Sequence, residues 1–507
     1  MPVYRPRLSL VAASLAGTLL LTGCGASGAA APVVRNPTAN PAKADALKVP
    51  RGFDVTAGWR ADTRNRTFAV APKANVIVDV DTRSDIPKAT SRSKTRTSTY
   101  VIARGAADGK PWWWSTQLVP LQDQLRPRLA LVDRPDGEYV VLLRVGTIPE
   151  DGLTRARRVV IADSFAVVAS GPLIAPIHHI VRDVGSTADE IPASVGDGGV
   201  VFEDETRQGL VVKGFFWDPV TGESRELTPS GPADRRCLIG DTCSMRSFPL
   251  VATAAGMLME NWQSTESNTG DTTEGGTSKS ATCRSRTSPT HPCGRGFEIA
   301  GRWNSGSHAP PDRALGVPVS VTATAVVAAW WSPPEQGRDP DVLYAVHDLV
   351  TGTILAQTSC HTEQDLKTDV ERPLMPGGLS PNTRYLITGP LAVDMRGTAV
   401  CFAQDEKTNA MTLLSVSDQG IAYGEITSTA QERDDKAVPR VAVLDIAAKK
   451  ADELPAGATI PSAITTSGVA LFATMPKARA RIKYPTAVNL VPPTPAVVVA
   501  GPSPTAS

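Results

Sequence analysis

The chain has 507 residues, of which 41% are hydrophobic and 20% are charged, and its formal net charge at pH 7 is +1. Proteins that bind nucleic acid through its phosphates usually carry a clustered excess of Lys and Arg. The balanced charge therefore excludes nucleic acid as an expected partner. The length exceeds what most single cores can use, but it suits a fold that grows by adding repeats.

The first residues have the order of a secretory signal. Arg5 and Arg7 precede an apolar run from Leu8 to Leu21, and Thr22, Gly23 and Cys24 follow it. Such a basic, then apolar, then small-residue order is typical of a segment that is cleaved on export. The run is shorter than the roughly 20 residues that a membrane-spanning helix needs, so we expect cleavage.

The four residues Leu21-Thr22-Gly23-Cys24 resemble the bacterial lipobox. The resemblance implies that residues 1–23 are a lipoprotein signal peptide and that Cys24, the new amino terminus, carries a diacylglycerol thioether and acyl chains such as palmitate. Two or more acyl chains hold a protein stably on a membrane. We therefore expect a protein anchored by lipid to the extracytoplasmic face of the cell membrane. A secreted protein whose cleavage site happens to end in Cys is the alternative.

Three segments lack the pattern of a folded core. Residues 24–48 are rich in Gly, Ala, Pro and Asn and predict a flexible linker after the lipidated cysteine. Residues 264–292 are rich in Ser, Thr and Gly and predict a surface insertion. Residues 484–507 are rich in Pro, Val and Ala and predict a disordered tail, or at most one edge strand. The folded domain is thus expected over 49–483. The Arg-, Ala-, Pro- and Thr-rich composition resembles that of actinobacterial proteins.

The cysteines fit an oxidising compartment. Six remain once Cys24 is assigned to lipid, and an exported chain can oxidise them. Although 15 pairings are possible, the spacing favours Cys237 with Cys243 and Cys283 with Cys293 as local loop bonds. Cys360 and Cys401 would then join neighbouring repeats. The spacings do not fit a zinc site, so no metal is expected.

The hydrophobic pattern predicts an all-β chain. Short runs of β-branched and small residues, bounded by Gly, Pro, Asp and Asn, recur every ten to fifteen residues. These runs cover 68–80, 129–132, 139–145, 159–170, 199–202, 210–217, 319–331, 342–348, 385–393, 398–402 and 441–445. Such regular spacing indicates a sandwich, a barrel or a propeller.

A repeated turn favours the propeller. Residues 218–222 and 348–352 both read D-x-x-T-G, and looser versions stand at 106–110, 416–420 and 444–449. Asp accepts hydrogen bonds from the backbone two or three residues on, and Gly adopts the positive φ that closes the hairpin. These turns resemble those between the two outer strands of blades in quinoprotein-like (PQQ-type) β-propellers. The resemblance implies a propeller of about seven blades, with six to eight possible.

Two tryptophan clusters are the candidate binding residues, namely Trp112, Trp113, Trp114, Trp330 and Trp331. Neighbouring strand residues point to opposite faces of a sheet, so at least one residue of each cluster is expected to be exposed. Exposed aromatic side chains can form a platform for a sugar or a peptide. Packing of all five between blades is the alternative.

The remaining polar motifs predict no catalytic or metal centre. His178 and His179 are adjacent and diverge, Asp79, Asp81 and Asp85 lack the Gly and Glu of a calcium loop, and neither a G-x-S-x-G nor a nucleotide-binding glycine motif occurs. We therefore expect no cofactor, no catalytic residues and a monomer.

The leading hypothesis is a non-catalytic binding or scaffold module for an envelope protein, a peptide or a glycan. A propeller enzyme with a loop-borne active site, either a quinone-dependent dehydrogenase or a carbohydrate-active enzyme, is the second hypothesis. A purely structural or sensory module is the third.

Overall fold

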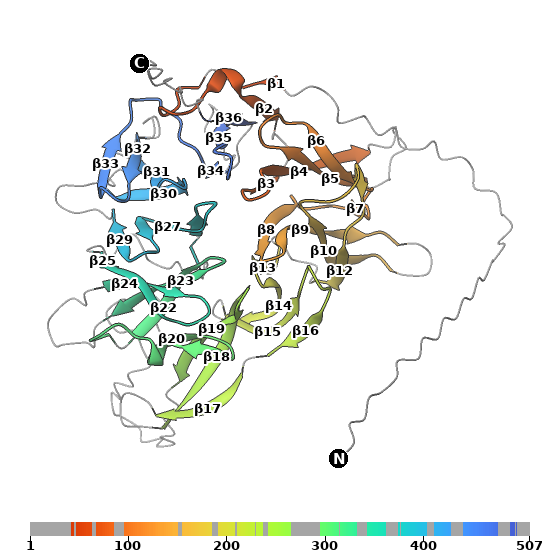
Figure 1. Cartoon of the computed structure of the whole chain (residues 1–507). Helices are drawn as coiled ribbons and strands as arrows, with labels where there is room; N and C mark the ends of the chain where they lie inside the picture. The colour runs from red at the N-terminus through yellow and green to blue at the C-terminus, as the bar shows by residue number, and fades with distance from the viewer. Residues whose placement is uncertain are drawn as a thin grey trace, which may run out of the picture. The chain divides into compact units, whose positions relative to one another are not determined.

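The computed structural model describes residues 42–44, 47–62, 67–85, 96–150, 155–184, 191–207, 210–228, 230–236, 242–264, 295–313, 315–331, 342–360, 374–375, 377–402, 410–426, 440–474, 487–491 and 493. These residues form a β-propeller of eight blades, here numbered I to VIII in chain order. The count lies at the upper end of the predicted range and is one above the favoured number. Figure 1 shows the blades following one another around a ring.

Each blade is an antiparallel sheet whose first strand is called A and whose fourth strand is called D. Blade I consists of β3 (Phe68–Ala71), β4 (Val76–Asp85), β5 (Arg96–Gly105) and β6 (Pro111–Ser115). Blade II consists of β8 (Arg128–Arg134), β9 (Gly137–Ile148), β10 (Arg157–Ala166) and β12 (His178–Asp183). Blade III consists of β13 (Ala193–Gly196), β14 (Gly199–Arg207), β15 (Leu210–Trp217) and β16 (Ser224–Leu227). Blade IV consists of β18 (Thr242–Thr253), β19 (Gly256–Ser264), β20 (Arg295–Ile299) and β21 (Trp303–Asn304), with β17 (Ser230–Arg236) paired to β18.

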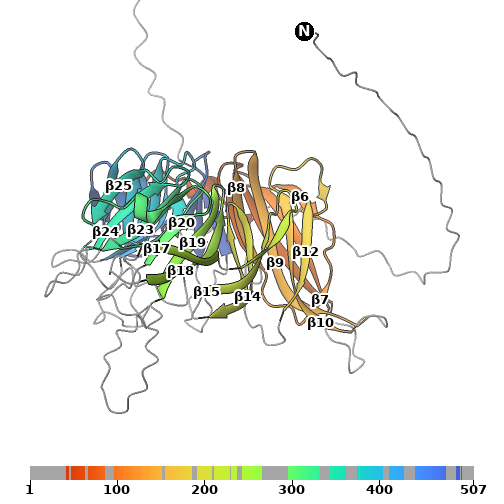
Figure 2. The same ribbon diagram turned by 90° about the horizontal axis from the view of Figure 1, so that it is seen from below.

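The second half of the ring has shorter strands. Blade V consists of β22 (Leu315–Val321), β23 (Ala325–Trp331), β24 (Val342–Asp348) and β25 (Ile354–Ser359). Blade VI consists of β26 (Gly377–Leu379), β27 (Tyr385–Thr388), β28 (Leu391–Asp394) and β29 (Thr398–Cys401). Blade VII consists of β30 (Met411–Val416), β31 (Ile421–Ile426), β32 (Arg440–Asp445) and β33 (Lys450–Glu453). Figure 2 shows the longer strands of the first blades, such as β9, β10 and β14, reaching further toward one end than β23 to β25.

Blade VIII closes the ring with strands from both ends of the described chain. Its order is β34 (Ala463–Ile464), β35 (Ala470–Thr474), β36 (Ala487–Val491), β2 (Trp59–Asp62) and β1 (Ala42–Lys43). The pairing of β2 with β36 sets Trp59 opposite Leu490. In Figure 1 the orange β2 accordingly lies beside the blue β36.

The closure corrects two predicted boundaries. The predicted linker over 24–48 contains β1, and Leu47 packs against the apolar cluster between blades VII and VIII. The predicted tail over 484–507 contains β36, which is an internal strand between β35 and β2 and not an edge strand. Both errors have the same cause, because a blade shared by the two chain ends leaves no local periodicity in either segment.

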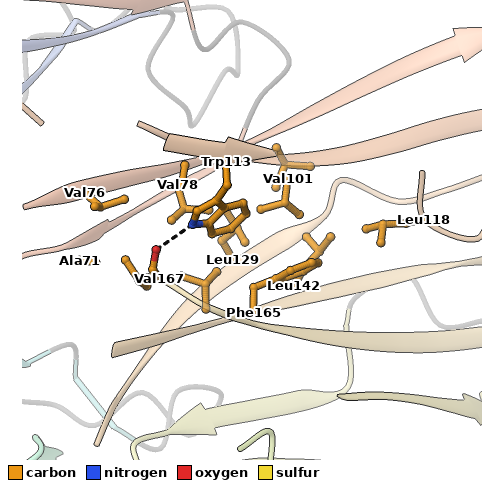
Figure 3. Close-up of a cluster of buried hydrophobic side chains, with 13 residues drawn as sticks. Ala71, Val76, Val78, Val101, Trp113, Leu118, Leu129, Leu142, Phe165 and Val167 are labelled. Atoms are coloured by element: carbon orange, nitrogen blue, oxygen red, sulfur yellow. Dashed lines mark hydrogen bonds between the residues drawn. The ribbon is translucent and has the colours of Figure 1, made fainter. Parts of the chain in front are cut away.

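The core is divided among the interfaces between blades. Each of the eight pairs of neighbouring blades encloses its own cluster of buried apolar side chains. Figure 3 shows the cluster between blades I and II, where Trp113 and Val78 of blade I meet Phe165 and Leu142 of blade II. Because every cluster needs two sheets, the burial of apolar surface stabilises the ring as a whole.

The D-x-x-T-G turns have the predicted chemistry. Asp348 Oδ1 accepts from the backbone N–H groups of Val350 and Thr351 at 3.0 and 2.7 Å, and Gly352 has φ +74°. The turn at Asp218 repeats this arrangement, with Gly222 at φ +77°. Both join strands C and D of their blades. The looser match at 416–420 is different, because it joins β30 and β31, the first two strands of blade VII.

Short turns and long connections lie at opposite ends of the strands. In a four-stranded antiparallel blade the A–B and C–D turns fall at one end, and the B–C and D–A connections fall at the other. The A–B turns are short, for example 135–136, 197–198 and 254–255. The B–C connections include 86–95, 265–294, 332–341, 427–439 and 475–486, which lie outside the described residues. The predicted Ser/Thr/Gly-rich insertion is thus the B–C connection of blade IV.

Candidate functional site

Three buried tryptophans join successive blades through their indole N–H groups. Each lies in strand D of one blade and donates to a backbone carbonyl of the next blade, just after the end of that blade's third strand. Trp59 donates to Ala106 at 2.7 Å, Trp113 to Val167 at 2.8 Å and Trp303 to Leu349 at 3.0 Å. Figure 3 shows the bond from Trp113. A buried indole needs such a partner, so these bonds fix where the outer turns of blades I, II and V lie.

The two tryptophan clusters are split between core and surface. Trp113 is fully buried against Phe165, and Trp330 is 1% exposed. These two were predicted to contribute to a binding platform, and their burial removes them from it. Trp112 is 45% exposed, while Trp114 and Trp331 are half-buried. The predicted alternation within each cluster is confirmed for Trp112 and Trp113, because neighbours on a strand face opposite sides.

A short segment, residues 167–177, crosses from blade II to blade I and back. We call it the strap. It leaves β10, pairs in parallel with β6 through β11 (Leu173–Ile174), and returns to blade II at β12. The backbone N–H of Trp114 donates to Pro172 O at 2.9 Å, and that of Thr116 donates to Ile174 O at 2.7 Å. Blade I thereby gains a further outer strand that comes from its neighbour.

Three of the seven exposed large hydrophobic side chains of the described residues lie on the strap. Val168 is 70% exposed, Leu173 is 55% exposed and Ile177 is 43% exposed. Leu173 lies opposite Trp114 in the β6–β11 pair, and Trp112 precedes Trp114 by two residues on the same side of the strand. We call Trp112, Val168, Leu173 and Ile177 the strap patch. Clustered exposed apolar side chains of this kind mark contact surfaces.

At the end of blades I and II that carries the long connections, a short strand joins the two blades. There β7 (Leu121–Gln122) pairs with both β5 and β9 and joins blades I and II into one ten-stranded sheet. Arg144 of β9 is fully buried beneath it, and its guanidinium contacts Asp163 Oδ2 and Val119 O, both at 2.7 Å. This pair is a structural anchor, since a buried charge requires a partner.

Charged side chains link the short turns of blades I, II and III. Lys73 Nζ lies 2.7 Å from Asp133 Oδ2, and Arg134 lies 3.1 Å from Asp218 Oδ2. Arg134 also donates to Gly198 O at 2.8 Å. These contacts connect three blades near their A–B and C–D turns, so they hold the first part of the ring together.

Two carboxyl groups in this network have raised pKa values. Burial raises the pKa of Asp197 to about 6, and the nearby Asp133 acts in the same direction, although Asp197 Oδ1 accepts the backbone N–H of Asp133 at 2.8 Å. Burial also raises the pKa of Glu138, against the effect of backbone N–H donors from Ala74 and Lys73. Removal from water disfavours the charged form of a carboxyl group.

The other residues singled out in the sequence either make contacts that stabilise the fold or lie outside the residues that the structure describes. Cys360 and Cys401, predicted as the remaining pair that joins neighbouring repeats, form a disulfide between blades V and VI. Cys24, Cys237, Cys283 and Cys293 lie outside the described residues, and Cys243 is described only as backbone of β18. His178 packs against the turn glycine Gly222 of blade III, and Asp79 is buried near Arg104.

No metal or membrane-spanning element is found within the ranges that the structure describes. Among those residues, no three His, Cys, Asp or Glu side chains are grouped so as to hold a metal ion. Among them too, no helix is long and apolar enough to cross a bilayer.

No protein-family model matches the chain, and no curated protein matches it. Among solved structures, the tricorn protease matches at 12% identity and a TM-score of 0.22, over 88% of this chain and 40% of that one. The β-propeller domain of the Trilobed protease from Pyrococcus furiosus matches at 7% identity and a TM-score of 0.29, over 82% and 90% of the two chains. The acylaminoacyl peptidase of Pyrococcus horikoshii matches at 9% identity and a TM-score of 0.29, over 85% of this chain and 52% of that one. The chain thus spans about half or less of the length of the tricorn protease and of the acylaminoacyl peptidase.

Proposed function

We propose that the chain is an exported lipoprotein whose propeller is a non-catalytic binding module for an envelope protein, a peptide or a glycan. In this proposal Cys24 carries the lipid and holds the propeller on the extracytoplasmic face of the membrane. The disulfide between Cys360 and Cys401 supports export, because such bonds persist in oxidising compartments.

The observation that carries the binding role is the unequal length of the connections at the two ends of the strands. Apart from the strap, the A–B and C–D turns at one end are short, whereas the B–C connections at the other end include 265–294 and 427–439. Long loops on a rigid scaffold are where binding residues concentrate. We therefore assign partner binding to the end that carries the long connections.

Lipid attachment is tested by growing cells that express the chain with a radioactive fatty acid. The mature protein is expected to carry label and to sediment with membranes, and Cys24→Ala is expected to abolish both. An unlabelled wild-type chain that appears in the medium would overturn the anchored role.

Partner binding is tested by immobilising the purified chain and retaining components of a cell-envelope extract. Replacing residues 268–288 by a short Gly-Ser linker is expected to remove the retained component. Gly301→Ala, in the short C–D turn of blade IV, serves as the matched control, because nothing lies within 4 Å of the added methyl group. Equal retention by both variants would contradict the assignment to the long connections.

A further inference from the structure

We propose that the strap patch lies against the lipid bilayer to which the chain is anchored and so fixes the orientation of the propeller on the membrane. This inference rests on the lipid attachment proposed above, and it adds a second contact with the membrane. It concerns the outer edge of blades I and II and not the end that carries the long connections.

The composition of the strap fits a bilayer better than a polar partner. Residues 167–177 contain no charged side chain, and Ser170 is the single residue among them whose side chain can form hydrogen bonds. Protein and glycan sites combine apolar surface with placed polar groups. The patch instead joins three branched aliphatic side chains to one tryptophan, and Trp is the residue that prefers the boundary between lipid and water.

The shape of the strap fits insertion into a deformable surface. Val168 at 70% exposure and Leu173 at 55% exposure flank the chain reversal at Gly171 and Pro172. Side chains this exposed at a reversal project outward and do not line a hollow. Burying them against acyl chains removes apolar area from water, which is favourable.

Several backbone groups of the strap already have partners within the propeller, which lowers the cost of moving them away from water. Its carbonyls at Val167, Pro172 and Ile174 accept hydrogen bonds from blade I, and the N–H of Ile177 donates to Ser164 O at 2.8 Å. Pro172 and Pro176 have no N–H to satisfy. These bonds hold the strap to blades I and II as a folded segment.

The chain enters the propeller in a blade next to the patch. The chain enters the propeller at β1 of blade VIII, and blade VIII packs against blade I, where Trp112 lies. Residues 24–41 separate the lipid from β1 and reach at most about 60 Å when fully extended. Of the seven exposed large hydrophobic side chains of the described residues, four belong to the strap patch; Val119, Val350 and Leu414 do not.

The test uses the full, acylated chain in vesicles of phosphatidylcholine and phosphatidylglycerol whose acyl chains carry bromine, a quencher of tryptophan fluorescence. The wild-type chain is expected to be quenched relative to vesicles of unbrominated lipid. Trp112→Phe is expected to remove that quenching, and Leu173→Glu is expected to reduce it by placing a charge at the contact. Val350→Glu, a 52% exposed site on blade V, is the matched control and is expected to leave it unchanged.

The outcomes separate this inference from the function on which it rests. A chain that carries fatty acid and floats with the vesicles, but shows no quenching dependent on Trp112, overturns the membrane contact and leaves the anchor intact. A chain without fatty acid overturns both. If vesicles do not quench Trp112 while an envelope extract shields it from iodide, the patch binds a protein or a glycan and the bilayer contact is wrong.

Discussion

The indole N–H of Trp330 donates to Nε2 of His347 over 3.2 Å, and both side chains are buried in the cluster between blades IV and V. The other ring nitrogen of His347, Nδ1, lies 3.0 Å from Gly352 O, so it carries the proton and donates. This tautomer needs a neutral imidazole, because a protonated Nε2 would face a donor. Burial, together with the nearby His308, lowers the pKa of His347 to about 4.

The neutral state of His347 predicts a dependence of stability on pH. The pKa is about 6.5 in the unfolded chain and about 4 in the folded one, so the unfolded chain takes up the proton first as the pH falls. The free energy of unfolding is therefore fully maintained above pH 6.5 and declines between pH 6.5 and 4, by up to about 3 kcal/mol. Urea denaturation across this range should show a smaller decline for His347→Gln, whose amide can make both hydrogen bonds. Parallel declines would contradict the assignment.

Adjacent tryptophans are expected to respond very differently to the same substitution. Trp113→Phe leaves the buried carbonyl of Val167 without its donor, which costs about 1–3 kcal/mol. Trp112→Phe changes a side chain that is 45% exposed and should alter the free energy of unfolding by less than about 0.5 kcal/mol. Chemical denaturation of the purified variants measures both. Similar losses for the two would argue against the docking role of Trp113.

The turn glycine of blade V combines backbone and packing requirements. Gly352 has φ +74°, and an added methyl group would lie 2.7 Å from the Trp303 ring. Gly301 has φ +75° with nothing within 4 Å of such a group. Gly301→Ala therefore measures the cost of the left-handed backbone alone, about 1 kcal/mol, whereas Gly352→Ala adds a steric clash. Thermal unfolding should rank Gly352→Ala as clearly the less stable, and equal midpoints would show that Trp303 moves aside freely.

Local chemistry explains which features the sequence could predict. Asp348 and Gly352 shape a turn of five residues through contacts within that turn. The turn and its hydrogen bonds could therefore be predicted without knowing how the blade is built. The alternation of Trp112 and Trp113 follows equally from strand geometry. Which of the two is buried depends on Phe165 and Val167 of the next blade, and that information lies outside the cluster.

Long-range pairing explains what the sequence did not reveal. Blade VIII joins β2 to β36, and the strap joins Leu173 to Trp114 in a parallel pair, so neither leaves a local repeat. The absence of charge in 167–177 was the available signal for the strap, but the segment could equally have been the end of a buried strand. The favoured number of seven blades, within a predicted range of six to eight, was one short for the same reason, since blade VIII cannot be recognised in either half alone.

The cross-blade disulfide is expected to contribute strongly to stability. Cys360 and Cys401 are separated by 41 residues, and closing a loop of that size stabilises a fold by about 4 kcal/mol in the chain-entropy model. The double variant Cys360→Ala, Cys401→Ala should lose about that much, measured by denaturation without reductant. Adding dithiothreitol should bring the wild-type chain toward the variant. If neither the double substitution nor dithiothreitol lowers the free energy of unfolding, packing between blades V and VI is sufficient without the disulfide.

The buried pair of Arg144 and Asp163 gives a double-mutant test of the junction between blades I and II. Arg144→Met leaves the Asp163 carboxylate buried without its cation, and Asp163→Leu leaves the guanidinium without its anion, so each single change should cost about 3–5 kcal/mol. The double variant removes both charges and should recover a large part of that loss. Additive losses would show instead that the hydrogen bond from Arg144 to Val119 O, and not the ion pair, holds the junction together.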